Sequence, residues 1–160
     1  MRYLLFLLTL LFVDTQAVEI NRVLPTGSMM PIFDESHYLI VDKREFSDIK
    51  VGEVIVYRTK TPFIVDGISY DCVVHAVWRK SSGGRVVLCK GVNNPVPDSE
   101  LITEADYLGT VICWVDKDTF YSPAFNLAAE SKKAPANVFD MMGEKERKIF
   151  LDGAGKGDKS

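Results

Sequence analysis

Short runs of β-branched and aromatic residues, separated by turn residues, occupy most of the chain between positions 38 and 115. Runs of this length and composition are typical of strands, and no helical periodicity of any length interrupts them. They cover residues 38–43, 53–58, 63–66, 72–78, 85–90 and 107–115. The pattern therefore predicts a mainly β fold, a compact antiparallel sheet within a β-rich α+β class.

The segment between the fourth and fifth runs, residues 81–84, reads Ser-Ser-Gly-Gly and predicts a hairpin turn. A hairpin that is symmetric about residues 82 and 83 places His75 opposite Lys90. The same register places Cys72 opposite Asn93.

Beyond Trp114 the spacing of apolar residues becomes helical. Ser122 followed by Pro123 predicts an N-cap with proline in the first helical position, and Pro135 is expected to end this helix. A second amphipathic stretch follows, with apolar residues at Val138, Phe139, Met142, Ile149 and Phe150. We therefore expect a β-rich domain over residues 18–121, a helical segment over 122–151 and a disordered tail over 152–160.

Residues 1–17 have the features of an export signal. One positive residue, Arg2, precedes an apolar run over residues 3–13 that only Thr9 interrupts. Spanning a bilayer takes about 20 apolar residues, whereas the apolar part of a signal peptide has about 7–15. Thr15 and Ala17 stand at the −3 and −1 positions of an A-x-A-like cleavage site. We expect a signal peptide or a short uncleaved anchor, with residues 18–160 exported to the extracytoplasmic face of the membrane or the periplasm; a buried amino-terminal helix is the alternative.

Composition and charge narrow the class of protein further. The chain has 160 residues and a net charge of -3, with 19 basic and 22 acidic residues spread through it. One domain is expected at this length, and no basic stripe suits a nucleic-acid backbone. The three cysteines, Cys72, Cys89 and Cys113, are too few and too widely spaced for a disulfide scaffold or a CxxC metal site. Cys72 and Cys89 are also offset in the predicted hairpin, which argues against a bridge between them.

Four segments carry candidate chemistry: PTGSMMP at 25–31, VGEVIVYR at 51–58, VVHAV at 73–77 and KGVNNPVPD at 90–98. A serine hydroxyl becomes an effective nucleophile when a neighbouring imidazole accepts its proton. A carboxylate on the other imidazole nitrogen selects the tautomer and stabilises the imidazolium. Ser28, His75 and Asp98 supply these three groups, although a Gly-Ser pair near a proline is by itself only a turn.

In this order and spacing the four segments resemble the boxes of the type I signal peptidase family, over about residues 24–115. The family consists of serine proteases that remove signal peptides from exported precursors. The resemblance implies that Ser28 is the nucleophile, His75 the base and Asp98 the acid, as in the endoplasmic-reticulum and archaeal form, which carries His where the common bacterial form has Lys. It also implies an oxyanion hole made of the Ser28 N–H and the Thr26 hydroxyl, and substrate contact at Met29.

The activity that the resemblance implies needs no metal and no cofactor. The expected substrates are precursor proteins cut after small residues, at Ala-x-Ala-like sites on the membrane surface. A neighbouring possibility is a specialised maturation peptidase of the same fold that processes one pilin or conjugation protein. The competing class is a degenerate, non-catalytic module that binds extended peptides.

Three residues depart from the pattern of the family's His form. Val92 stands where that form has a second carboxylate, so Asp98 is expected to act without help. Ala76 replaces an arginine that follows the base, so an ion pair is expected to be missing, and Glu53 replaces an aspartate with the same charge.

Other candidates are weaker. His37 is expected to be a solvated residue at a strand edge, and Trp78 and Trp114 core or membrane-interface aromatics. Lys90, predicted opposite His75, is an alternative base, but it requires strong desolvation to act as one.

Overall fold

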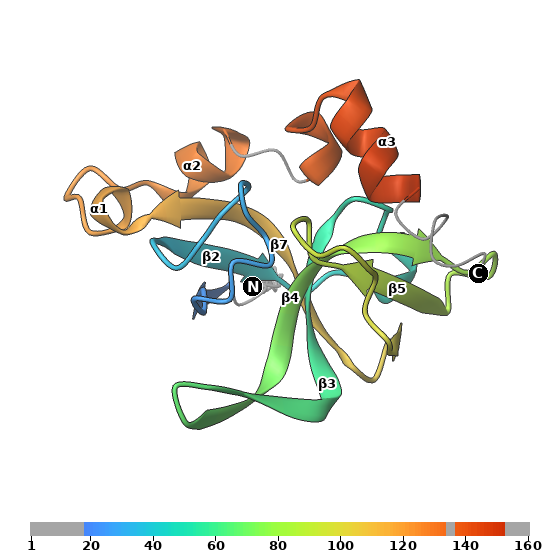
Figure 1. The fold of residues 1–160 in the computed structure, drawn as a ribbon. Helices are drawn as coiled ribbons and strands as arrows, with labels where there is room; N and C mark the ends of the chain where they lie inside the picture. Colours follow the sequence, from blue (N-terminus) through green and yellow to red (C-terminus); the bar gives the residue numbers. More distant parts are fainter. Residues whose placement is uncertain (1–17, 134–136, 153–160) are drawn as a thin grey trace, which may run out of the picture.

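One seven-stranded antiparallel sheet organises the protein (Figure 1), with strand order β1-β2-β7-β3-β4-β5-β6. The computed structural model describes residues 18–133 and 137–152, so the predictions for residues 1–17, for Pro135 and for 153–160 lie outside it. The strands are β1 (Glu19–Arg22), β2 (His37–Asp42), β3 (Val54–Val65), β4 (Ile68–Lys80), β5 (Val86–Lys90), β6 (Leu101–Thr103) and β7 (Tyr107–Asp116). Strands hold 42% of the described residues and helices 19%, which confirms the predicted β-rich α+β class.

The long β3–β4 hairpin is the centre of the sheet and projects from it at one end (Figure 1). The runs predicted at 53–58 and 63–66 are one strand, with an irregularity between Arg58 and Phe63. Asp66 and Gly67 connect β3 to β4 with φ values of 51° and 77°. Two successive residues with positive φ are the mark of the tight hairpin turn that an Asp-Gly pair favours. This turn and the short edge strands β1 and β6 are not among the elements predicted from the sequence.

The predicted register of the β4–β5 hairpin is wrong, by two residues next to the turn and by one residue at His75. Ala76, not His75, is paired with Lys90, and Val77 is paired with Cys89. The register then shifts, because Trp78 is an extra residue between the Val77 and Arg79 pairs. Pairing with β5 ends at Ala76, so Cys72 does not lie opposite Asn93 either.

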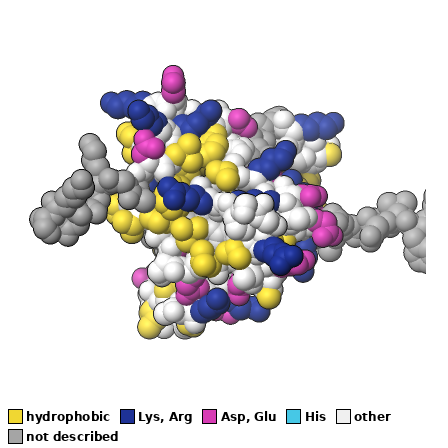
Figure 2. Space-filling view, turned by 90° about the vertical axis from the view of Figure 1, so that its right-hand side faces the viewer, with side chains coloured by type: hydrophobic (Ala, Val, Ile, Leu, Met, Phe, Trp, Pro, Cys, Tyr) yellow, Lys and Arg dark blue, Asp and Glu magenta, His cyan; other side chains and the backbone are white. Residues whose placement is uncertain are grey.

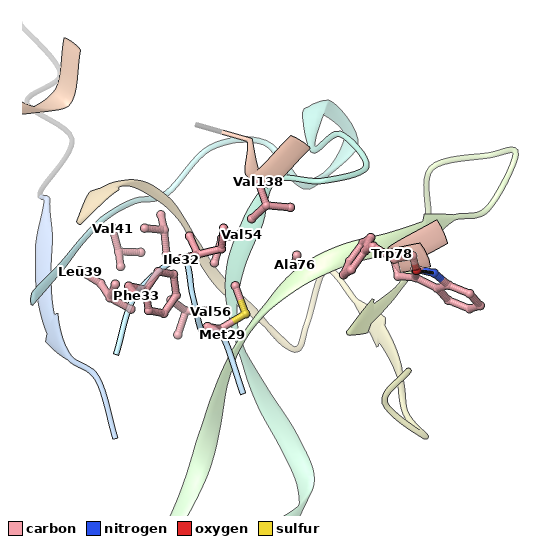
Figure 3. Close-up of a cluster of buried hydrophobic side chains, with 12 residues drawn as sticks. Met29, Ile32, Phe33, Leu39, Val41, Val54, Val56, Ala76, Trp78 and Val138 are labelled. Carbon is pink, nitrogen blue, oxygen red and sulfur yellow. Dashed lines mark hydrogen bonds between the residues drawn. The ribbon is translucent and has the colours of Figure 1, made fainter. Parts of the chain in front are cut away.

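Burial on both faces of the sheet explains why the strands read as nearly continuous apolar runs. One cluster, drawn in Figure 3, joins the loop before β2 to β2, β3 and β4 and includes Met29, Phe33, Leu39 and Val56. The second cluster lies on the other face and includes Ile55, Tyr57, Val77, Cys89 and Tyr107. All three cysteines are free thiols, Cys72 being exposed and the other two buried.

Short helices follow the last strand: α1 (Lys117–Phe120), α2 (Leu127–Lys133), the 3-10 turn η2 (Val138–Asp140) and α3 (Glu144–Asp152). A further 3-10 turn, η1 (Phe46–Asp48), lies between β2 and β3. The prediction that Ser122 caps a helix is wrong. Ser122 Oγ accepts a hydrogen bond from the Ala124 N–H at 3.2 Å and closes a local turn. The Asn126 side chain instead accepts from the Ala129 N–H at 3.2 Å, at the start of α2.

The described helices differ in length but share one property. None of those within residues 18–133 and 137–152 has the length and apolar character of a membrane span.

On the face shown in Figure 2, positive and negative side chains are interspersed around a group of hydrophobic ones. That face therefore carries no broad field of a single sign.

The α3 helix attaches to the sheet through Phe150. This side chain is 3% exposed and joins the first core cluster, whereas its neighbour Ile149 is 60% exposed. The Phe150 carbonyl also accepts a hydrogen bond of 2.8 Å from the Trp78 indole N–H.

We expect Phe150→Ala to lower the free energy of unfolding by about 3–5 kcal/mol, because it opens a cavity in the core. Urea denaturation of the full chain measures this change. Ile149→Ala is the matched control and should have little effect, since that side chain faces water. Equal effects of the two substitutions would show that α3 does not pack as described.

Candidate active site

Ser28 lies on the loop between β1 and β2, where its neighbours Gly27 and Met29 determine the path of the backbone. Gly27 has a φ of +66°, a conformation that favours glycine, and its carbonyl accepts from the Met30 N–H at 3.2 Å. Met29 is 3% exposed and packs into the first core cluster. The buried Met29 therefore anchors the loop and leaves the half-buried Ser28 at its surface.

The segment after β5 holds the same loop from the other side. The Asn93 N–H donates to the Ser28 carbonyl at 2.8 Å, and the Asn93 side-chain amide donates to the Gly27 carbonyl at 3.2 Å. Gly91 allows this close approach, because a Cβ there would lie 2.8 Å from the Ser28 carbonyl oxygen. The 90–98 segment thus positions the serine as well as carrying Asp98.

His75 and Asp98 form a close pair. His75 Nδ1 lies 2.8 Å from Oδ2 and 3.0 Å from Oδ1 of the Asp98 carboxylate. The two side chains are only 11% and 17% exposed, so water screens their interaction weakly. Because Nδ1 is engaged by the carboxylate, Nε2 is the ring nitrogen that remains to accept a proton.

Asp98 has a second partner that the sequence analysis missed. The Tyr57 hydroxyl donates to Asp98 Oδ2 at 2.6 Å, so a phenol contacts Asp98 although Val92 replaces the second carboxylate. Burial, reinforced by the nearby carboxylate, raises the pKa of the Tyr57 phenol well above its usual range, and the phenol therefore remains a donor. Val92, which stands in place of the second carboxylate, packs against the first core cluster.

Ser28 and His75 line one groove, whose volume is about 870 Å³. Thr26 and Met29 also line it, and the Thr26 and Ser28 hydroxyl oxygens are 3.2 Å apart. No hydrogen bond joins Ser28 to His75 within residues 18–133 and 137–152. Such contacts are often long in enzymes without substrate and tighten when substrate binds.

Strand β4 borders this groove. Residues 72–75 line it, and the part of β4 that precedes Ala76 pairs with β3 but not with β5. An unpaired strand edge offers N–H and C=O groups to an extended peptide. The groove thus combines a strand edge with a serine and a histidine.

Lys90 does not belong to this group. Its partner Ala76 is adjacent to His75 on β4, so the two side chains leave the sheet on opposite faces. The Lys90 ammonium donates to the Phe150 carbonyl at 3.4 Å. Lys90 is 3% exposed, and its burial lowers the pKa of the ammonium. The corrected register removes the reason for considering Lys90 as a base.

The other residues singled out in the sequence, Ala76, Glu53 and His37, make packing or polar contacts of their own. Ala76 is fully buried in the first core cluster, and Glu53 is buried, accepting from the Lys50 N–H at 2.8 Å with Arg44 at 3.6 Å. His37 opens β2 and lies 3.0 Å from Asp34. Among the residues that the structure describes, no three His, Cys, Asp or Glu side chains converge on a point that a metal ion could occupy.

Comparison of the chain with protein-family models, with curated proteins and with solved structures finds no match.

We expect Gly91→Ala to lower the free energy of unfolding by about 1–3 kcal/mol, because the added methyl group forces the 90–98 segment away from the Ser28 carbonyl. Urea denaturation measures the loss. Gly83→Ala is the matched control, since a Cβ there meets open space, and should be nearly neutral. A neutral Gly91→Ala would contradict the close approach of the two segments.

Proposed function

We propose that this protein is a serine endopeptidase that removes signal peptides from exported precursor proteins, cutting after small residues at the membrane surface. The observation that carries the proposal is the close His75–Asp98 pair in the groove that Ser28 also lines. The order and spacing of the sequence boxes supply the substrate class.

In the proposed mechanism an extended substrate adds as a strand to the free edge of β4. Ser28 Oγ attacks the scissile carbonyl while His75 Nε2 takes the hydroxyl proton, and Asp98 stabilises the resulting imidazolium. The Ser28 N–H and the Thr26 hydroxyl stabilise the oxyanion. His75 then gives the proton to the leaving amine, and water hydrolyses the acyl-enzyme by the reverse sequence of proton transfers.

A non-catalytic peptide-binding module is the second candidate. The observation that favours it is the missing hydrogen bond between Ser28 and His75, because a binding module has no need of one. The pairing of His75 with Asp98 favours the enzyme, since peptide binding along a strand edge requires no buried imidazole–carboxylate pair.

Ser28→Ala and His75→Ala should each lower kcat/KM by about 1000-fold or more, because the serine and its base act as one unit. A fluorogenic Ala-x-Ala peptide, assayed with the full chain, measures this loss. His37→Ala, which alters the other histidine of the chain, should retain activity. Cleavage undiminished by Ser28→Ala would refute the mechanism, and peptide binding without cleavage by the unaltered protein would favour the binding module.

Lys90→Met should leave kcat/KM within about twofold of the unaltered protein, because the side chains of Lys90 and His75 leave the sheet on opposite faces and an apolar chain of similar length fills the same space. The same peptide assay measures the effect. A loss as large as that of His75→Ala, in a variant that keeps its thermal stability, would instead identify Lys90 as the base.

A further inference from the structure

We propose that Tyr57 is a positioning residue, which shares one oxygen of the Asp98 carboxylate with His75 and, by withdrawing part of its negative charge, sets how strongly His75 retains a proton. The catalytic consequence rests on the proposed function, whereas the hydrogen-bonded chain from Tyr57 to His75 does not. Its experiment is therefore a titration that needs no cleavage.

The geometry of Asp98 Oδ2 is the first argument. This one oxygen accepts from the Tyr57 hydroxyl at 2.6 Å and lies 2.8 Å from His75 Nδ1. Asp98 stands in a segment without regular structure between β5 and β6, where one backbone bond, from its N–H to the Cys89 carbonyl at 2.9 Å, ties it to β5. The Tyr57 phenol, which is held on strand β3, thus fixes the rotation of the Asp98 carboxylate.

The position of Tyr57 on the sheet is the second argument. Ile55 lies directly opposite His75, and Tyr57 is two residues further along β3, so Tyr57 and His75 are diagonal neighbours on one face. Tyr57 is 2% exposed within the second core cluster. Its ring is therefore held by packing, and its hydroxyl presents a fixed donor to the carboxylate.

The effect on His75 follows from charge. A hydrogen bond to a carboxylate withdraws part of its negative charge, which weakens its hold on an imidazolium. Loss of the Tyr57 hydroxyl leaves Asp98 with a larger unshared charge, so His75 should keep its proton to higher pH. Among the described residues, the other ionisable groups that face these side chains are Cys89 and Glu100 beside Tyr57 and Asp98, and Arg22, Asp34, Glu35, Tyr70, Cys72 and Lys117 in the groove. The Tyr57→Phe substitution leaves all of them in place.

The experiment is an NMR pH titration of the two histidines in the full, ¹⁵N-labelled chain, with His37→Ala used to assign the signals. Tyr57→Phe should raise the titration midpoint of His75 by about half a pH unit or more, the size of a typical hydrogen-bond effect on a neighbouring charge. In an Asp98→Asn background the same substitution should have no effect, because the carboxylate that connects the two residues is absent.

Tyr107→Phe is the matched control. Tyr107 is paired with Tyr57 across β7 and β3 and is buried in the same cluster, and its hydroxyl lies 2.8 Å from Thr110 Oγ1. Removal of this hydroxyl should leave the His75 midpoint unchanged. An unchanged or lowered midpoint in Tyr57→Phe, or an equal shift in the Asp98→Asn background, would overturn the proposal. If Ser28→Ala left cleavage intact, the proposed function would fail, but the titration would still test the coupling of Tyr57 to His75 through Asp98.

Discussion

The pairing of β3 with β4 is the interaction on which the rest of the structure depends. It places Val54, Val56 and Ala76 on one face of the sheet and Ile55, Tyr57 and His75 on the other. Each face is covered by its own apolar cluster, so a slip of one residue would bury polar groups among apolar ones and expose the apolar ones. The burial of both faces therefore also determines on which side His75 must lie.

The loops then bring the candidate site together at the edge of this rigid centre. The loop after β1 carries Ser28, and the segment after β5 carries both Asn93, which binds the serine loop, and Asp98, which binds His75. Ser28 and Asp98 are thus connected through one segment, although they are far apart in sequence. A disturbance of that segment would act on both at once.

The sequence predicted the fold class well, because alternation and β-branched composition report directly on burial in a sheet. It failed at the register of the β4–β5 hairpin, which depends on the exact centre of the turn and on an irregularity in β4. The centre of the turn lies one residue later than the Ser-Ser-Gly-Gly segment suggested, and the extra residue Trp78 then shifts the pairing by one, so the predicted partners of His75 and Cys72 were wrong. The Asp66-Gly67 turn, in contrast, had a recognisable signal, since an Asp-Gly pair between two apolar runs is a strong mark of a hairpin.

The sequence by itself determined which residues are available for chemistry, and it also determined the β-rich class, since both follow from residue type and local order. Only the tertiary structure decided that Lys90 faces away from His75 and that Tyr57 reaches Asp98 from 41 positions earlier in the chain. The reason is physical. Hydrogen bonds between distant segments depend on register, twist and packing, and these are settled when the two apolar clusters form together.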